Sequence, residues 1–180
     1  CAYDTLAEAV NAAQSGDTIR LEGTTFVMNP LAIDGKDLTL AGGYGDAGPV
    51  GCLTDTQYWD TTLQLSPGWT AKAIWVMNAT VNFSRLVFYG NVEGGGLIVS
   101  DGAVNLVYVN FGNTNGGMHV AGSTADLSHC GFYDNDAGPS DGGGILAYGP
   151  ATRVTLTDVL FRRNHAGGRG GAVSLSSGAQ

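Results

Sequence analysis

Three aspartates that could bind a metal ion lie close together in the second half of the chain. The group, within the segment YDNDAGPSD, consists of Asp134, Asp136 and Asp141. Three arginines follow in the next glycine-rich stretch: Arg162, Arg163 and Arg169. Because carboxylate oxygens are the ligands that calcium prefers, the aspartates are a candidate calcium site. Aspartate is also a common turn former, and a purely structural loop is the alternative.

Aromatic residues that could contact a ligand gather in an irregular segment over residues 46–70. They are Tyr58, Trp59 and Trp69. Exposed aromatic rings could stack against sugars, which predicts a ligand-binding role for this segment. The alternative is that these rings seal the side of the fold where its packing is irregular.

An internal repeat in the second half of the chain shows which elements must position these residues. Four eight-residue windows align without gaps: VNFSRLVF (Val81–Phe88), VNLVYVNF (Val104–Phe111), ADLSHCGF (Ala125–Phe132) and VTLTDVLF (Val154–Phe161). Apolar residues occupy positions one, three, six and eight of each window. This pattern predicts two strands whose inward-facing parity changes at a corner between them, as in the coils of a solenoid. Cys130 takes position six, and we therefore expect its thiol to be buried.

The fifth position of each window falls at the predicted corner and should face solvent. Its residues are Arg85, Tyr108, His129 and Asp158. Stacked coils would place these side chains in one column with steps of about 5 Å. Such a column could be an active-site ladder or an ordinary variable surface, and the sequence does not decide between them. Asparagines three residues after the phenylalanines (Asn91, Asn135 and Asn164) predict a hydrogen-bonded ladder at another corner.

The first 16 residues have a different pattern from the rest of the chain. Tyr3–Gln14 is the one convincing helix, with Asp4 or Thr5 as its N-cap and with Leu6, Val10 and Ala13 on one face. A helix before strands alone is what a solenoid needs to cover its end. We predict one all-β domain over residues 1–180, with a helical cap at 1–16, a first coil at 17–45, the irregular insertion at 46–70 and regular coils over 71–180.

Composition narrows the possible functions. A net charge of −8 argues against a nucleic-acid partner, because phosphate contacts need clustered lysines and arginines. No apolar run approaches the roughly 18 residues of a membrane span. The sequence ends in the middle of a predicted coil, at GGAVSLSSGAQ, which predicts that further β-helix coils or a partner cover this end.

Several segments resemble those of exported bacterial proteins. FYDNDAGPSDGGGI (132–145) and FRRNHAGGRGGAV (161–173) resemble the paired FxxN and GGA[I/V] repeats of chlamydial-type polymorphic outer-membrane proteins and related autotransporter passengers. TLAEAVNAAQSGDTIRL and KDLTLAGGYG resemble the capped start of secreted pectate-lyase-like β-helix proteins. The resemblance implies a right-handed parallel β-helix, export to the bacterial surface or medium, and often adhesion. For an exported protein, a disulfide between Cys1 and Cys52 is plausible.

Three functions follow as hypotheses. The leading one is a non-catalytic, adhesin-like passenger module without a required cofactor, which binds a host or cell-surface glycan or protein. The second is a polysaccharide lyase or hydrolase for acidic glycans, similar to calcium-dependent pectate lyases, in which the metal holds the acidic sugar and an arginine removes a proton. That chemistry needs the three aspartates and an arginine to converge on one groove. The third is a purely structural spacer.

Overall fold

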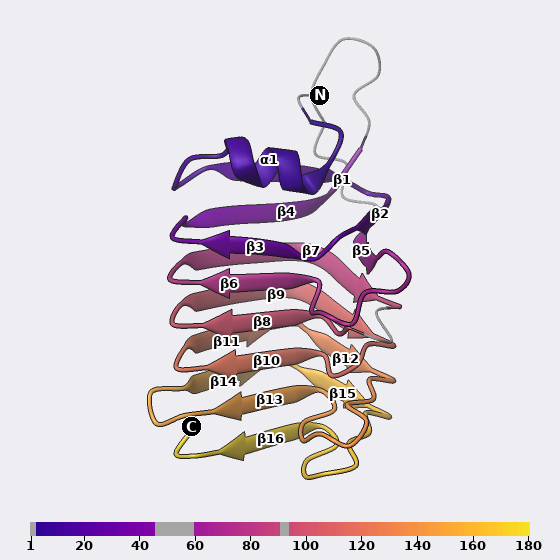
Figure 1. Ribbon diagram of the computed structural model, residues 1–180, viewed down its shortest axis with the longest axis vertical. Helices are drawn as coiled ribbons and strands as arrows, with labels where there is room; N and C mark the ends of the chain where they lie inside the picture. Colours follow the sequence, from indigo (N-terminus) through magenta and orange to yellow (C-terminus); the bar gives the residue numbers. More distant parts are fainter. Residues whose placement is uncertain (1–2, 46–59, 91–93) are drawn as a thin grey trace.

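The computed structural model describes residues 3–45, 60–90 and 94–180, which form a parallel β-helix with a short N-terminal helix (Figure 1). The coils enclose one core and present three faces. The first face contains β1 (Thr18–Glu22), β4 (Leu38–Tyr44), the first halves of β7 (Thr80–Tyr89) and β9 (Ala103–Gly112), β11 (Thr124–Ser128) and β14 (Arg153–Thr157). The second face contains β2 (Thr25–Met28), β5 (Thr61–Leu65), the second halves of β7 and β9, β12 (Gly131–Tyr133) and β15 (Leu160–Arg162).

The third face is a separate six-stranded parallel sheet. Its strands are β3 (Leu31–Asp34), β6 (Ile74–Met77), β8 (Leu97–Ser100), β10 (Met118–Ala121), β13 (Ile145–Tyr148) and β16 (Val173–Ser176). The predicted fold class, a right-handed parallel β-helix with a helical cap, is confirmed.

The repeat predicted from the sequence sets the register of the coils. Val81 pairs with Val104, which pairs with Ala125, and Phe88 pairs with Phe111. In β7 and β9 the ladder runs through the corner, so that one strand contributes to two faces. The eight-residue windows are therefore structurally equivalent, as their alignment predicts.

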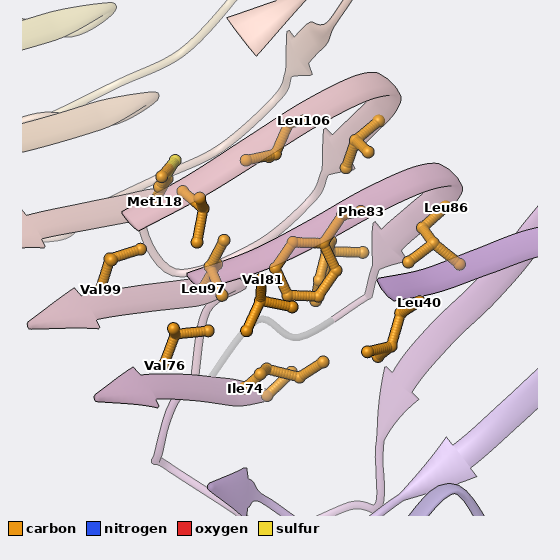
Figure 2. Packing of buried hydrophobic residues seen from close by; sticks show 14 of the residues in the cluster. Leu40, Ile74, Val76, Val81, Phe83, Leu86, Leu97, Val99, Leu106 and Met118 are labelled. Carbon is orange, nitrogen blue, oxygen red and sulfur yellow. The ribbon is translucent and has the colours of Figure 1, made fainter. Parts of the chain in front are cut away.

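The core is built from the inward-facing residues of all three faces (Figure 2). Val81, Phe83, Leu86 and the residues that pair with them in β9 are at most 1% exposed. Phenylalanines at position eight form a continuous stack along the axis: the ring centroids of Phe88–Phe111, Phe111–Phe132 and Phe132–Phe161 are 4.8, 4.8 and 5.0 Å apart. The separation equals the spacing of neighbouring strands, because each coil places its ring directly on the previous one.

Three columns of left-handed residues turn the chain at its corners. The first corner contains Arg85, Tyr108, His129 and Asp158, between the first and second faces. The second corner contains Gly90, Asn113, Asp134 and Arg163, after the second face. The third corner contains Gly35, Asn78, Asp101, Gly122, Gly149 and Ser177, after the third face. All ten non-glycine residues with positive φ in the described ranges belong to these corners, so left-handed residues recur at equivalent places in successive coils.

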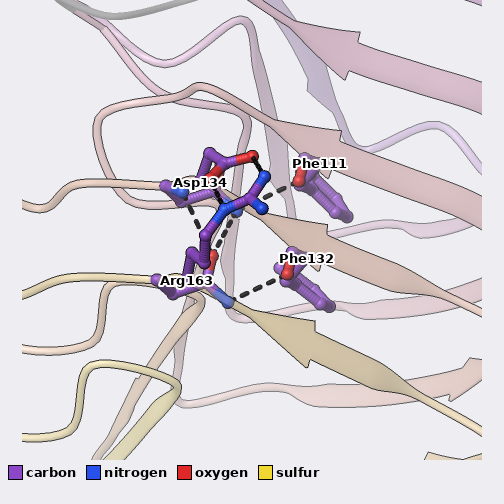
Figure 3. Close-up of polar contacts among 6 residues, drawn as sticks. Phe111, Phe132, Asp134 and Arg163 are labelled. Atoms are coloured by element: carbon purple, nitrogen blue, oxygen red, sulfur yellow. Dashed lines mark hydrogen bonds and ion pairs between the residues drawn. The ribbon is translucent and has the colours of Figure 1, made fainter.

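The predicted polar ladder lies just beyond the second corner. Asn135 is fully buried, and its Nδ2 donates to the carbonyl oxygen of Phe111 (3.0 Å) and to Asn164 Oδ1 (2.9 Å). Thr114 takes the asparagine position in the preceding coil, and its hydroxyl donates to Asn135 Oδ1 over 2.7 Å. Asn164 Nδ2 repeats the pattern by donating to the carbonyl oxygen of Phe132 (Figure 3). Asn91, the third predicted member, lies outside the described residues.

Glycines open the third face because the coils approach closely there. A Cβ on Gly117 would lie 2.7 Å from the carbonyl oxygen of Gly144 and 2.8 Å from Phe132 Cδ1. Gly96 and Gly144 stand in the same relation to the rings of Phe111 and Phe161. The absent side chain therefore leaves room for the phenylalanine of the next coil.

The cap is α1 (Leu6–Ala12), which is shorter than the predicted Tyr3–Gln14. Thr5 is the N-cap and forms a capping box with Glu8, which fixes where the helix begins. Leu6, Ala9 and Val10 are buried, and α1 lies across the end of the stack (Figure 1). Lys36 Nζ donates to the carbonyl oxygens of Val10 and Asn11 at the other end of the helix.

The segment 46–70, expected to be irregular, contains part of a regular coil. Residues 46–59 lie outside the described residues, but Thr61–Leu65 forms β5, which pairs in parallel with β2 and β7. Thr61, Leu63 and Leu65 point inward and are buried. The irregular interpretation is therefore wrong for these five residues, which alternate between inward-facing and outward-facing positions as a regular strand does.

Candidate functional site

The first corner carries four side chains from successive coils that could act together, of which Arg85 is half-buried and the others are exposed; we call them the corner column (Arg85, Tyr108, His129 and Asp158). Each of these residues is left-handed, with φ between 52° and 56°. The strand pairing on both sides of the corner places them in successive coils, as the sequence predicts. Their side chains therefore project from the same corner of the β-helix.

Contacts within the corner column join one coil to the next. The rings of Tyr108 and His129 have centroids 4.9 Å apart and are tilted by 32°. His129 Nε2 lies 3.6 Å from Asp158 Oδ2, and the two side chains are 49% and 74% exposed. Tyr108 is 53% exposed. The column thus offers an aromatic surface next to hydrogen-bonding groups that water, or a ligand, can reach.

The three aspartates of the candidate calcium site have separate partners. Asp134 receives two hydrogen bonds from Arg163, one of them 2.7 Å long, across the second corner (Figure 3). Asp136 Oδ1 lies 3.0 Å from His165 Nδ1 and accepts a hydrogen bond from the amide of Gly138. Asp141 Oδ1 accepts from the amide of Arg169. Each aspartate therefore fastens its loop to the loop of the next coil.

The electrostatics of these pairs agree with a structural role. The hydrogen bond from Arg163 lowers the pKa of Asp134, and the hydrogen bond with His165 lowers the pKa of Asp136. The same contact with Asp134 raises the pKa of Arg163. An arginine whose cationic form is stabilised in this way is a poor candidate for removing a proton from a sugar.

The described ranges contain no group of three or more histidine, cysteine, aspartate or glutamate side chains that could hold a metal ion. Calcium binding at Asp134, Asp136 and Asp141 stays a prediction that titration of the chelator-treated protein would test. Within the described structure, Arg163 contacts Asp134 and the amide of Arg169 contacts Asp141. The guanidinium of Arg163 is therefore engaged by Asp134, whereas Arg162 is exposed and Arg169 takes part through its backbone amide.

The remaining predicted site residues fall in different places. Trp69 is 45% exposed, and its Nε1 donates to Asn29 Oδ1 over 3.1 Å. Tyr58 and Trp59 lie outside the described residues, as do Cys1 and Cys52, whose disulfide stays a prediction. Cys130 is a free thiol and only 3% exposed, as expected from position six of the repeat. Burial raises the pKa of this thiol, which disfavours the reactive thiolate.

A buried lysine near the third face is a feature that the sequence analysis missed. Lys72 is 8% exposed, and its Nζ donates to the carbonyl oxygens of Asn115 (2.6 Å) and Gly116 (2.9 Å). Its side chain passes over Gly95, where a Cβ would lie 2.2 Å from Nζ. Burial lowers the pKa of Lys72 to about 8, and burial with the nearby ammonium lowers the pKa of His119 to about 4. The lysine thus links its own coil to the second coil beyond it.

A hollow of about 620 Å³ lies between α1 and the first coil. Its apolar lining includes Leu6, Ala9, Leu21 and Phe26, the first three of which are buried core residues, and Arg20 and Glu22 contribute polar atoms. The lining is therefore largely the interface between the cap and the core, and we attribute the hollow to cap packing.

Among the described residues, no helix has the length and apolar character needed to cross a membrane. Comparisons of the chain with protein-family models, with curated protein sequences and with solved structures found no significant match. The arguments for function therefore depend on the geometry of the chain itself.

Proposed function

We propose that this chain is a non-catalytic, adhesin-like binding module of an exported surface protein, in which the β-helix holds a recognition surface in a fixed position. The observation that carries the proposal is the corner column. Stacked coils hold its four side chains in register, and its contacts leave Tyr108, His129 and Asp158 substantially accessible. A rigid, repeated surface of this kind suits recognition because little conformational entropy is lost on binding.

The choice of residues at the three corners supports this interpretation. A left-handed residue other than glycine, asparagine or aspartate is unfavourable by roughly 1 kcal/mol or more. The third corner has only one such residue, Ser177, and the second has only Arg163, whose guanidinium bonds Asp134. The first corner has three in four coils: Arg85, Tyr108 and His129. Side chains kept at a position that disfavours them are candidates for a role in binding.

Adhesion and turnover assays on the same protein would test the proposal. Fluorescently labelled protein should bind intact eukaryotic and bacterial cells saturably, and its binding should fall when the cell surfaces are oxidised with periodate or digested with protease. In parallel, polygalacturonate, alginate and heparin should release no unsaturated or reducing-end products. Product release would instead favour the lyase or hydrolase. Absence of both adhesion and product release would favour the purely structural spacer.

A variant of the corner column connects the assay to the surface. Tyr108→Asn removes the ring but keeps a residue that tolerates the left-handed conformation, so the fold should be retained. We expect a loss of cell binding of about tenfold, against no change for Tyr148→Ala on the third face, where Tyr148 is 43% exposed. Equal adhesion by both variants would remove the corner column from the binding surface.

A further inference from the structure

Three tyrosines and a histidine share one side of the β-helix, around the second face and its first corner. We call this surface the tyrosine face; it comprises Tyr89, Tyr108, Tyr133 and His129. Tyr89 and Tyr108 are 51% and 53% exposed, and the side chain of His129 is 49% exposed. Tyr133 is half-buried at the outward-facing end of β12. The full sequence contains seven tyrosines, and three of them belong to this face.

Two of the rings lie over glycines of the sheet. A Cβ on Gly131 would be 2.3 Å from Tyr133 Cε2 and 2.4 Å from the hydroxyl oxygen, which places the Tyr133 ring across the backbone of its own strand. A Cβ on Gly112 would be 3.0 Å from Tyr89 Cδ2, and these two residues pair directly between β7 and β9. Glycine at both outward positions therefore allows the rings to rest on the sheet instead of standing away from it.

The strand pairing sets what lies beside Tyr133. Gly131 pairs with Asn110 on one side and with Leu160 on the other, so the Tyr133 ring has an amide and an exposed leucine as its neighbours. Tyr108 and Tyr133 come from neighbouring coils, whose paired strands are about 4.8 Å apart.

Polar groups surround the rings. Tyr133 pairs with the exposed Arg162, the ring of Tyr108 contacts the tilted ring of His129, and His129 adjoins Asp158. Aromatic faces attract the apolar C–H face of a pyranose ring, while amide, imidazole, carboxylate and guanidinium groups bond its hydroxyls. The tyrosine face therefore offers both kinds of contact that a pyranose ring makes.

We propose that the tyrosine face is a carbohydrate-binding site that takes an extended oligosaccharide of pyranose units. The sugar chain lies across the coils, with Tyr108 and Tyr133 as its main stacking contacts and with Asn110, His129 and Arg162 as hydrogen-bonding groups. This inference rests on the proposed binding function and names its ligand class and its contact residues.

The test uses immobilised cellohexaose, chitohexaose, maltohexaose and hexagalacturonate, with binding of the 180-residue protein measured by biolayer interferometry. We expect binding to at least one of these glycans, and the panel separates neutral from acidic sugars. Tyr108→Asn and Tyr133→Ala should each weaken that binding by about tenfold, whereas the exposed Tyr148→Ala control should leave it unchanged.

Gly131→Ala provides a second variant that keeps every tyrosine. Gly131 does not have a positive φ, so alanine suits the backbone, but its Cβ would push the Tyr133 ring away from the sheet. Glycan binding should fall although the circular dichroism spectrum and the melting temperature stay close to those of the parent.

The outcomes separate this inference from the proposed function. Binding that depends on Tyr108, Tyr133 and Gly131 supports both. Glycan binding that survives all three changes, or cell adhesion without binding to any of the four glycans, overturns the tyrosine face and leaves the binding module standing. Absence of both adhesion and glycan binding overturns both proposals.

Discussion

Burial of a single histidine makes the stability of the molecule depend on pH. Partial burial on the outer side of the third face, next to Lys72, lowers the pKa of His119 from 6.5 to about 4. Between these pH values the unfolded chain binds a proton that the folded chain does not. The stabilisation is therefore complete above pH 6.5 and is lost as the pH falls through 4, with an upper limit of about 3 kcal/mol.

Urea unfolding at pH 7 and pH 4.5 checks this expectation. The free energy of unfolding should fall between the two values, and His119→Gln should reduce that fall because glutamine cannot bind the proton. His129→Gln, at the half-exposed histidine of the corner column, is the matched control. A pH dependence that is the same in the parent and in His119→Gln would contradict the role given to burial.

The buried amide of Asn135 is expected to be the most sensitive polar group of the ladder. Asn135→Ala removes both a donor and an acceptor, and leaves the carbonyl of Phe111 and the hydroxyl of Thr114 without these partners. Unsatisfied buried polar groups are costly, so we expect a loss of about 3 kcal/mol in the free energy of unfolding, measured with urea.

Asn105 offers the control for this change. Its Nδ2 donates to Asn82 Oδ1 on the outer surface of the first face, where water can replace the bond. Asn105→Ala should therefore cost no more than about 1 kcal/mol. A similar cost for both variants would mean that burial of the ladder contributes little.

At the scale of elements, glycine residues before the strands of the third face allow neighbouring coils to lie close together. Gly117→Ala would place a methyl group 2.8 Å from Phe132 Cδ1 and against the backbone of β13's coil. Either the phenylalanine stack or the third face must shift, and we expect a loss of about 1 to 3 kcal/mol in stability. Thermal unfolding followed by circular dichroism measures it.

Ala172 occupies the equivalent place in the last coil, since Gly144 pairs with it there. Ala172→Gly should change the stability by less than about 1 kcal/mol, because no ring of a following described coil lies against it. If Gly117→Ala were equally mild, the phenylalanine stack would not be what demands glycine at this position.

The sequence predicts those elements that repeat and fails for those that do not. Position eight predicts the phenylalanine stack, and position five predicts the first corner, because each coil reuses one geometry. The location of β5 and the course of Lys72 over Gly95 depend on loops that differ in length between coils. The rings of Tyr89 and Tyr133 lie over glycines in other repeat positions, a packing that no spacing in the sequence reveals.

The same distinction between repeated and unrepeated features applies to the candidate site. The corner column could be predicted because a column is a property of the repeat. The partners of Asp134, Asp136 and Asp141 could not, since adjacency in one loop suggests a shared ligand, whereas the parallel stacking of two loops gives each carboxylate its own partner. In a solenoid, residues that are one coil apart are closer neighbours than residues a few positions apart in the same loop.

At the scale of the whole molecule, the local stability of a protein made of these 180 residues alone should decrease toward the coil of β14 to β16. Each coil buries its core only against its neighbours, and α1 covers the first coil whereas no described coil follows β14 to β16. The exposure of equivalent inward-facing residues shows the difference: Leu127 in β11 is 2% exposed and Leu156 in β14 is 40% exposed, and Ala147 in β13 is fully buried whereas Leu175, which pairs with it in β16, is 52% exposed. The last coil therefore buries the least apolar surface, and its local opening should cost the least free energy.

Hydrogen exchange followed by mass spectrometry would measure this gradient. In a protein made of these 180 residues alone, amides of β7, β9 and β10 should exchange most slowly, those of β13 faster, and those of β14 to β16 fastest, because residues 1–180 supply no further coil against β14 to β16. Leu127→Ala, in the interior, should speed exchange in several coils at once, whereas Leu156→Ala should affect the last coil alone. Uniform protection from β7 to β16 would contradict the nearest-neighbour account and would mean that the polar ladder and the phenylalanine stack join the coils into one cooperative unit.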